Sequence, residues 1–266
     1  MNNIISARDV AFKLFGLEIY WYGVFITLGI VIAFILSFIL CKRKNLNDNL
    51  PYYILIAILP LGIICGRLFS VLLEEGSSIK DYFNFRDGGM SIIGAIIGGA
   101  IGIVLLCLIK KLNFFQVADV LCVVLILAQA IGRWGNYFND ELYGQQILDS
   151  SWQFFPFAVK IDGLYYEALF FYESILNLIG FVILICLFWF IKEKGVAVGG
   201  YFIYYGTVRF FLEPRRQSDF ILKLGKGQFS RIMSFVMIII GLAIITYVII
   251  NYFLKKKKMK EQNSEK

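Results

Sequence analysis

The sequence predicts an all-α integral membrane protein with seven transmembrane helices and an extracytoplasmic head region between helices four and five. Three observations lead to this fold class: the composition, the long apolar runs, and the distribution of lysine and arginine between the loops. Of 266 residues, 59% are hydrophobic and 17% charged, with a mean hydropathy of +0.74. A soluble domain is roughly 45–50% apolar and 25% charged. The composition therefore excludes a soluble enzyme, a disordered chain and a secreted disulfide scaffold, and residues 1–266 are expected to form a single polytopic membrane domain.

Seven apolar runs are close to the length of about 20 residues that a helix needs to cross a hydrocarbon core about 30 Å thick. They give expected spans at about residues 20–40, 51–73, 89–109, 115–131, 169–191, 198–212 and 234–254. The third span carries Gly94, Gly98 and Gly102 at intervals of four. This spacing lines one helix face and favours close packing against a neighbouring helix over contact with an acyl chain.

Residues 1–18 precede the first span and carry mixed charge. The apolar run that follows them is too long for the h-region of a signal peptide and lacks a small-residue cleavage site. We therefore expect no cleavable signal peptide, and we expect residues 1–18 to form an outward-facing segment on the membrane surface.

The distribution of basic residues predicts the orientation, because cytoplasmic loops of membrane proteins carry an excess of lysine and arginine. The loops and tail on one side of the predicted spans hold thirteen basic and four acidic residues, a net charge of +9, while the rest of the chain nets −2. The basic side is expected to be cytoplasmic, with the basic tail at residues 255–266. The N-terminus and the head region at residues 132–168 then face outward.

The chain offers little for metal or nucleic-acid binding. It contains no histidine, and its five cysteines are far apart with no CxxC pair, so the sequence predicts neither a disulfide framework nor a metal site. The lysine run in the tail is more typical of a topology signal beside anionic lipid headgroups than of a nucleic-acid site. We expect no metal, no cofactor and no nucleic-acid partner, and we expect the lipid bilayer as the surroundings.

Several charged residues lie inside or beside the apolar runs, where each costs about 2.5–3.5 kcal/mol on insertion scales. One explanation is local pairing, of Arg133 with Asp119 or Glu141 and of Arg209 with Glu213 four residues later. However, the arginines outnumber the nearby acids at one level of the membrane, which indicates a missing anion. A phospholipid headgroup is the obvious anion at that depth, and guanidinium groups suit phosphate. The set comprises Arg67, Asp119, Arg133, Glu173 and Arg209, with Arg215 and Arg216 just beyond the sixth span.

The densest polar segment is residues 132–144, GRWGNYFNDELYG, which directly follows an apolar run. Its glycines and asparagines predict an irregular backbone, which is tolerated at membrane depth only where it lines a polar cavity or is buried in protein. Arg133, Asn136, Asn139 and Glu141 place hydrogen-bonding groups close together here, beside aromatic residues that a plain connector does not need. We interpret this segment as a binding site.

The same segment resembles the signature of the bacterial phosphatidylglycerol–prolipoprotein diacylglyceryl transferases, whose pattern runs G-R-x-G-N-F-x-N-x-E-x-x-G. Supporting similarities extend along most of the chain. They are Tyr20-Trp21-Tyr22-Gly23, Gly66-Arg67, Asp87-Gly88-Gly89-Met90-Ser91, Asp119, Tyr172-Glu173-Ser174, Gly227-Gln228, and the run from Arg209 through Glu213 to Arg216.

This resemblance implies a seven-helix enzyme of the bacterial inner membrane with its N-terminus outside. Such an enzyme moves the diacylglyceryl group of phosphatidylglycerol to the lipobox cysteine thiol of a preprolipoprotein and releases glycerol phosphate. Carried onto this sequence, the resemblance implies that Arg133 and Arg216 handle the phosphate. Residues expected to bind substrate or shape its pocket are Tyr22, Arg67, Asn136, Asn139, Glu141, Gly144 and Arg209.

The chain departs from the family at both of its usual histidines. Ile93 occupies one of these positions and Glu167 the other, so imidazole is not available as a base. We expect a carboxylate, Glu167 or Glu141, to accept the thiol proton instead. One alternative is a divergent, non-catalytic lipid- or lipoprotein-binding paralogue that keeps the phosphate pocket. A channel or transporter is a second alternative, although the sequence has no internal symmetry typical of transporters.

Overall fold

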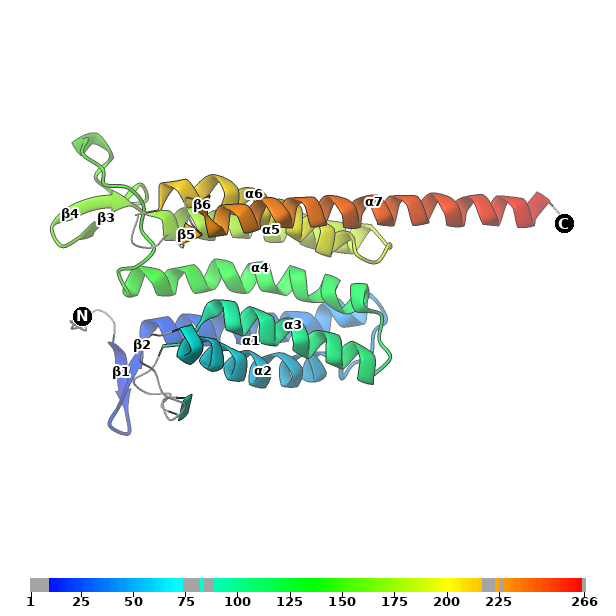
Figure 1. Ribbon diagram of the computed structural model, residues 1–266, viewed down its shortest axis with the longest axis horizontal. Coiled ribbons are helices and arrows are strands. Elements are labelled where there is room, and N and C mark those ends of the chain that lie inside the picture. The colour runs from blue at the N-terminus through cyan, green and yellow to red at the C-terminus, as the bar shows by residue number, and fades with distance from the viewer. Residues whose placement is uncertain (1–9, 74–81, 84–88, 217–222, 225–226, 265–266) are drawn as a thin grey trace. The chain divides into compact units, whose positions relative to one another are not determined.

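The computed structural model describes residues 10–73, 82–83, 89–216, 223–224 and 227–264, and helices dominate it (Figure 1). Within this part of the chain, six helices are long and apolar enough to cross a membrane, which confirms an all-helical membrane protein. The remaining long helix, α6, has 17 residues and is about 26 Å long at 1.5 Å per residue. The helices are α1 (Trp21–Arg43), α2 (Leu50–Leu73), α3 (Ile92–Ile109), α4 (Phe114–Phe138), α5 (Leu169–Phe190), α6 (Val196–Leu212) and α7 (Phe229–Ser264).

Each expected span corresponds to one of these helices, because a backbone in hydrocarbon must satisfy its own hydrogen bonds. Two helices are longer than the expected spans: α7 covers residues 229–264 rather than 234–254, so it includes most of the basic tail, and α4 also extends further. Irregular backbone was expected from Gly132 onward, but α4 continues as a helix to Phe138. The ring of Phe138 stacks on Trp21 at 5.0 Å and on Phe25 at 5.6 Å, so α1 supports this last turn. The loop expected at residues 132–168 therefore begins at residue 139.

The chain forms two compact units, of which the smaller comprises residues 36–120. Within it, α3 packs against α2 through the glycine face expected from the sequence. A Cβ atom on Gly94, Gly98 or Gly102 would collide with the carbonyl oxygen of Cys65, Leu61 or Ala57, respectively. These glycines therefore let the two backbones approach closely, which confirms the packing interpretation.

The larger unit comprises residues 1–35 and 121–266 and holds α5, α6 and α7 side by side (Figure 1). Small residues again form the contacts between helices. A Cβ on Gly241 of α7 would lie 2.8 Å from the Gly199 carbonyl oxygen of α6, and a Cβ on Gly206 would lie 2.9 Å from the Ser234 carbonyl oxygen. Tyr204 of α6 donates a hydrogen bond of 2.7 Å to the Leu176 carbonyl of α5.

Short hairpins lie outside the long helices. Strands β1 (Val10–Leu14) and β2 (Leu17–Tyr20) pair antiparallel directly before α1, so the described part of the N-terminal segment is a hairpin. Strands β3 (Ala158–Ile161) and β4 (Leu164–Glu167) pair between α4 and α5, after the 3₁₀ turn η2 (Ser150–Trp152). Strands β5 (Lys223–Leu224) and β6 (Gly227–Gln228) precede α7, and a second 3₁₀ turn, η3 (Glu213–Arg215), follows α6. Residues 1–9, Asp87-Gly88 and residues 265–266 lie outside the described residues.

Candidate active site

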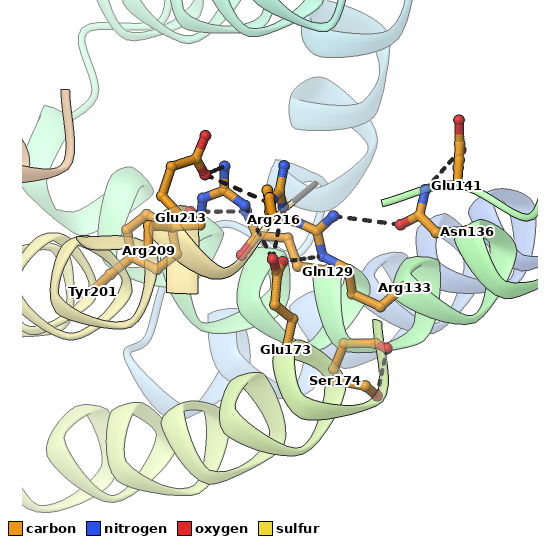
Figure 2. Close-up of polar contacts among 11 residues, drawn as sticks. Gln129, Arg133, Asn136, Glu141, Glu173, Ser174, Tyr201, Arg209, Glu213 and Arg216 are labelled. Carbon is orange, nitrogen blue, oxygen red and sulfur yellow. Dashed lines mark hydrogen bonds and ion pairs between the residues drawn. The ribbon is translucent and has the colours of Figure 1, made fainter. Parts of the chain in front are cut away.

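The centre of the site is the carboxylate of Glu173, which arginines from three segments approach (Figure 2). Its Oε2 atom lies 2.6 Å from Nε of Arg133 on α4. Its Oε1 atom accepts hydrogen bonds from Nη1 of Arg209 on α6 at 3.1 Å and from Nη2 of Arg216, just after η3, at 2.7 Å. The Glu173 side chain is only 3% exposed. The three guanidinium groups therefore share one buried carboxylate.

A second acid, Glu213 in η3, completes the cluster and is fully buried. Its Oε2 atom lies 2.6 Å from Nη2 of Arg209 and 3.5 Å from Nε of Arg216. The pairing of Arg209 with Glu213 expected from their spacing is confirmed. Three arginines face two glutamates, so the cluster has a net charge of +1.

The local partners considered for Arg133 are wrong. Asp119 lies on the same helix but 14 residues earlier, about 21 Å along the axis. Glu141 forms no ion pair with Arg133 among the described residues and is connected to it through Asn136. Nη1 of Arg133 donates to Oδ1 of Asn136 at 3.4 Å, and Nδ2 of Asn136 donates to Oε1 of Glu141 at 2.8 Å (Figure 2). The ion-pair partner of Arg133 is Glu173, from a different helix.

Hydrogen bonds fix the part of the signature segment that follows α4, in addition to the helix that contains its first residues. Nδ2 of Asn139 also donates to Glu141, at 3.4 Å, so two amides fix this carboxylate. The chain then turns through Asp140 and Leu142, whose φ angles of 47° and 58° are left-handed. On the helix itself, a Cβ on Gly135 would lie 2.9 Å from Cδ2 of Tyr22, so Tyr22 occupies the space that a side chain would need. The structure thus brings Tyr22, Asn136, Asn139 and Glu141 together with Arg133.

Gly144 connects the signature to Glu167 and Arg216. Its backbone forms an antiparallel bridge with Arg216, and its N–H donates to the Glu167 carbonyl at 3.0 Å. A Cβ on Gly144 would lie 2.6 Å from Oε2 and 2.7 Å from Cβ of Glu167. Only glycine fits between these two segments.

Glu167 lies at the end of β4 and pairs with Arg215 through its Oε1 atom at 3.1 Å. Its Oε2 atom is buried and has no hydrogen-bond partner among the described residues. Glu167 is therefore beside Arg216 in the backbone arrangement but is not part of the carboxylate–arginine cluster around Glu173. Its predicted role as a base stays a prediction.

Arg67 belongs to the smaller unit, where it is almost fully buried. Nη1 of Arg67 donates to the Gly89 carbonyl at 2.7 Å, and Nε donates to the Tyr82 carbonyl at 3.4 Å. These bonds tie α2 to the segment that precedes α3. The predicted role of Arg67 in substrate binding stays a prediction.

Sequence reasoning missed several polar residues near the cluster. It noted Glu173 as a buried charge but did not include it among the site residues. Gln129 lies one turn before Arg133 and donates to the Tyr201 hydroxyl at 3.0 Å. Asn177 lies one turn after Glu173, is fully buried, and has no hydrogen-bond partner for either amide atom within the described residues. Gln129 and Asn177 are each four positions from a charged residue of the cluster, and this spacing predicts that each shares a helix face with that residue.

The polar groups of the site do not form an obvious metal centre. Within the described ranges, no group of three or more histidine, cysteine, aspartate and glutamate residues is placed to hold a metal ion. The cluster is instead suited to an anion, because its charge is positive and its guanidinium groups are planar hydrogen-bond donors.

Comparison with known proteins identifies the same family throughout. A family model described as prolipoprotein diacylglyceryl transferase matches residues 9–247. A protein of Clostridium novyi named phosphatidylglycerol–prolipoprotein diacylglyceryl transferase is 37% identical over 249 residues, covering 90% of this chain and 95% of the relative. Relatives of corresponding name in Clostridium perfringens and Listeria monocytogenes serotype 4b are 36% and 33% identical, over 94% and 93% of this chain and 98% and 92% of their own lengths.

Proposed function

Because the chain belongs to the prolipoprotein diacylglyceryl transferase family, we propose that it transfers the diacylglyceryl group of phosphatidylglycerol to the lipobox cysteine of preprolipoproteins. The chain is an enzyme of a bacterial membrane. The observation that carries the proposed reaction is the convergence of Arg133, Arg209 and Arg216 on one buried glutamate with a net charge of +1. Such a cluster can take one phosphodiester, which carries a single negative charge.

The proposed topology follows from the distribution of basic residues. We propose that α6 also crosses the membrane, which brings the number of spans to seven. We further propose that the N-terminus and the head region, residues 139–168, are extracytoplasmic. The basic end of α7 is then cytoplasmic. The positive-inside rule supports this orientation, because the loops on the tail side carry the excess of lysine and arginine.

In the proposed mechanism, Arg133 and Arg216 hold the phosphate. Within the described part of the chain, Nη1 of Arg216 makes no hydrogen bond, so it is available to a ligand. The substrate thiolate attacks the carbon of the diacylglyceryl group that carries the phosphate. A carbon–sulfur bond forms, the carbon–oxygen bond to phosphate breaks, and its electron pair leaves with glycerol phosphate. Fixed cations next to the departing oxygen stabilise the charge that grows there, which is typically the largest catalytic contribution.

The thiol proton goes to a carboxylate in this proposal. The Oε1 atom of Glu141 already accepts hydrogen bonds from two amides, those of Asn136 and Asn139. Glu167 has one oxygen with no partner among the residues that the structure describes, and it lies across Gly144 from the backbone of Arg216. These contacts favour Glu167 over Glu141. The positive field of the arginines lowers the pKa of the incoming thiol, which reduces the demand on either base.

The decisive experiment is complementation in cells depleted of their own transferase, with lipid attachment to a lipobox cysteine as the readout. We expect the wild-type chain to restore lipidation and Arg133→Lys to abolish it at normal expression, because lysine cannot present a planar fork to phosphate. Arg43→Lys, at the far end of α1, is the matched control and should have no effect. Full lipidation by Arg133→Lys would refute the mechanism. No lipidation by the wild-type chain would instead favour a lipid-binding paralogue.

The identity of the base is tested separately in purified enzyme. Glu167→Gln should lower the rate at low pH and lose less as the pH rises, since more of the thiol then ionises without help. Glu141→Gln should lower the rate by a similar factor at every pH if Glu141 only positions Asn136. An unchanged pH–rate profile in Glu167→Gln would exclude Glu167 as the base.

A further inference from the structure

The head region carries an aromatic surface that the proposed reaction does not use. Trp152, Phe154 and Phe155 are 51%, 52% and 54% exposed, and Phe157 is 36% exposed. Since one aromatic side chain has about 150–250 Å² of surface, three half-exposed rings present on the order of 300 Å². Apolar patches of that size on a protein surface are often functional. We call residues 150–157, SSWQFFPF, the aromatic loop; it contains no charged residue.

The aromatic loop is held in a defined shape, so the exposure of its rings does not follow from a loose backbone. Asp149 caps η2, with its Oδ1 atom accepting the Ser151 N–H at 2.9 Å, and the Gln153 amide donates to the Ile147 carbonyl at 2.9 Å. The rings of Trp152 and Phe154 meet the Phe157 ring edge-on, with centroids 4.9 and 5.3 Å apart. The fold therefore presents these side chains from a fixed scaffold.

The aromatic loop contacts the first turn of α5, a candidate membrane span. The carbonyl oxygen of Phe157 accepts hydrogen bonds from the Ala168 N–H at 3.0 Å and from the Tyr172 hydroxyl at 2.9 Å. The Phe155 ring packs on Phe171 with centroids 4.9 Å apart. Phe171 and Tyr172 belong to the first turn of α5, a candidate span. The loop thus lies beside the Leu169 end of this candidate span, and Figure 1 shows the chain between α4 and β3 extending beyond this end of α5.

We propose that the aromatic loop is an interfacial membrane anchor, whose Trp152, Phe154 and Phe155 side chains insert into the headgroup boundary of the leaflet that contains the Leu169 end of α5. Aromatic side chains concentrate at this depth of the bilayer, where their apolar rings leave water. The absence of charge in the loop and its contacts with the first turn of α5 favour lipid over a peptide partner. The anchor holds the head region, with Gly144 and Glu167, against the lipid surface. This inference does not depend on the proposed reaction.

The test uses the fluorescence of Trp152 in the intact protein, reconstituted into phosphatidylcholine bilayers. The chain has four tryptophans, so the Trp152 contribution is obtained by subtracting the signal of Trp152→Phe from that of the wild type. We expect phosphatidylcholine brominated near the top of the acyl chains to remove most of this contribution, and aqueous iodide to remove little of it. Quenching by iodide without quenching by brominated lipid would overturn the proposal, because the loop would then be exposed to water, as a free surface or as a binding surface for a peptide. Absence of both would also overturn it, because protein would cover the rings.

Paired variants separate insertion from folding. The double variant Phe154→Asp/Phe155→Asp should lose most of the lipid quenching of Trp152, since charge at the interface opposes insertion. The matched double variant Phe154→Leu/Phe155→Leu keeps the apolar character and should retain it. Equal lipid quenching in the two variants would contradict the anchor. Because the wild-type measurement needs neither variant, the proposal stays testable if the aspartate variant does not fold.

Discussion

The Glu173→Gln variant tests the charge arrangement of the site most directly. In the wild type, the carboxylate lies 2.6 Å from Arg133, 3.1 Å from Arg209 and 2.7 Å from Arg216. Glutamine keeps the shape but removes the charge, so the cluster changes from +1 to +2. Arg209 and Arg216 still contact Glu213, whereas Arg133 loses its ion-pair partner within the described residues.

The magnitude follows from burial. Removing one partner of a buried ion pair costs about 3–5 kcal/mol, because the remaining charge stays unpaired in a poorly solvated site. The glutamine amide oxygen can still accept one hydrogen bond, so we expect the lower end, about 3 kcal/mol. That is roughly a 100-fold change in the unfolding equilibrium constant at about 1.4 kcal/mol per factor of ten. Thermal unfolding of the detergent-solubilised protein measures it.

Two further measurements make this prediction specific. Glu261→Gln, at an exposed pair 3.9 Å from Lys257, is the matched control and should leave the unfolding temperature unchanged. Adding Arg209→Gln to Glu173→Gln returns the cluster to +1, so the double variant should be less destabilised than the two single changes sum to, by about 0.5–3 kcal/mol. An unfolding temperature of Glu173→Gln equal to that of the wild type, or strictly additive effects, would refute the electrostatic reasoning.

Two more substitutions test the packing of the helices. Gly98→Ala should lower the unfolding free energy by about 1–3 kcal/mol, since its Cβ would collide with the Leu61 carbonyl and lie 2.8 Å from Cβ of Cys65. Gly99→Ala, whose Cβ would lie 3.5 Å from Cγ2 of Ile58, is the control and should be neutral or stabilising in the same unfolding assay; equal losses in both would contradict the glycine-face model. Asn177→Leu should raise the unfolding temperature, because it removes a buried amide that has no hydrogen-bond partner in the described part of the chain, which costs about 1–3 kcal/mol. A lower unfolding temperature for Asn177→Leu would indicate that the amide is paired in the membrane.

Patterns within one helix were predictable from the sequence, because their neighbours are fixed by the helical repeat. Glycines four residues apart share a face whatever the rest of the chain does, so the packing of Gly94, Gly98 and Gly102 could be predicted. The same applies to Arg209 and Glu213, four residues apart across the end of α6.

Partners from different helices were not predictable, because sequence distance gives no information about them. Glu173 lies 40 positions from Arg133, and only the packing of α4 against α5 and α6 makes it the shared carboxylate. The length of α4 was mispredicted for a related reason. Gly132 and Gly135 each disfavour a helix by about 1 kcal/mol, but Tyr22 packs on Gly135 and Phe138 stacks on Trp21, and these contacts from α1 outweigh the local preference.

The structural and functional interpretations of the buried charges are complementary. Glu173 and Glu213 neutralise two of the three arginines, which lets the guanidinium groups gather in a buried position at all. The one charge they leave is costly without a partner, because a poorly solvated ion gains little from water. A bound anion removes this cost, and it stabilises the folded state by an amount that grows with its concentration relative to its dissociation constant. The cluster therefore holds α4, α5 and α6 together, and in the proposed function its remaining positive charge binds the singly charged phosphodiester.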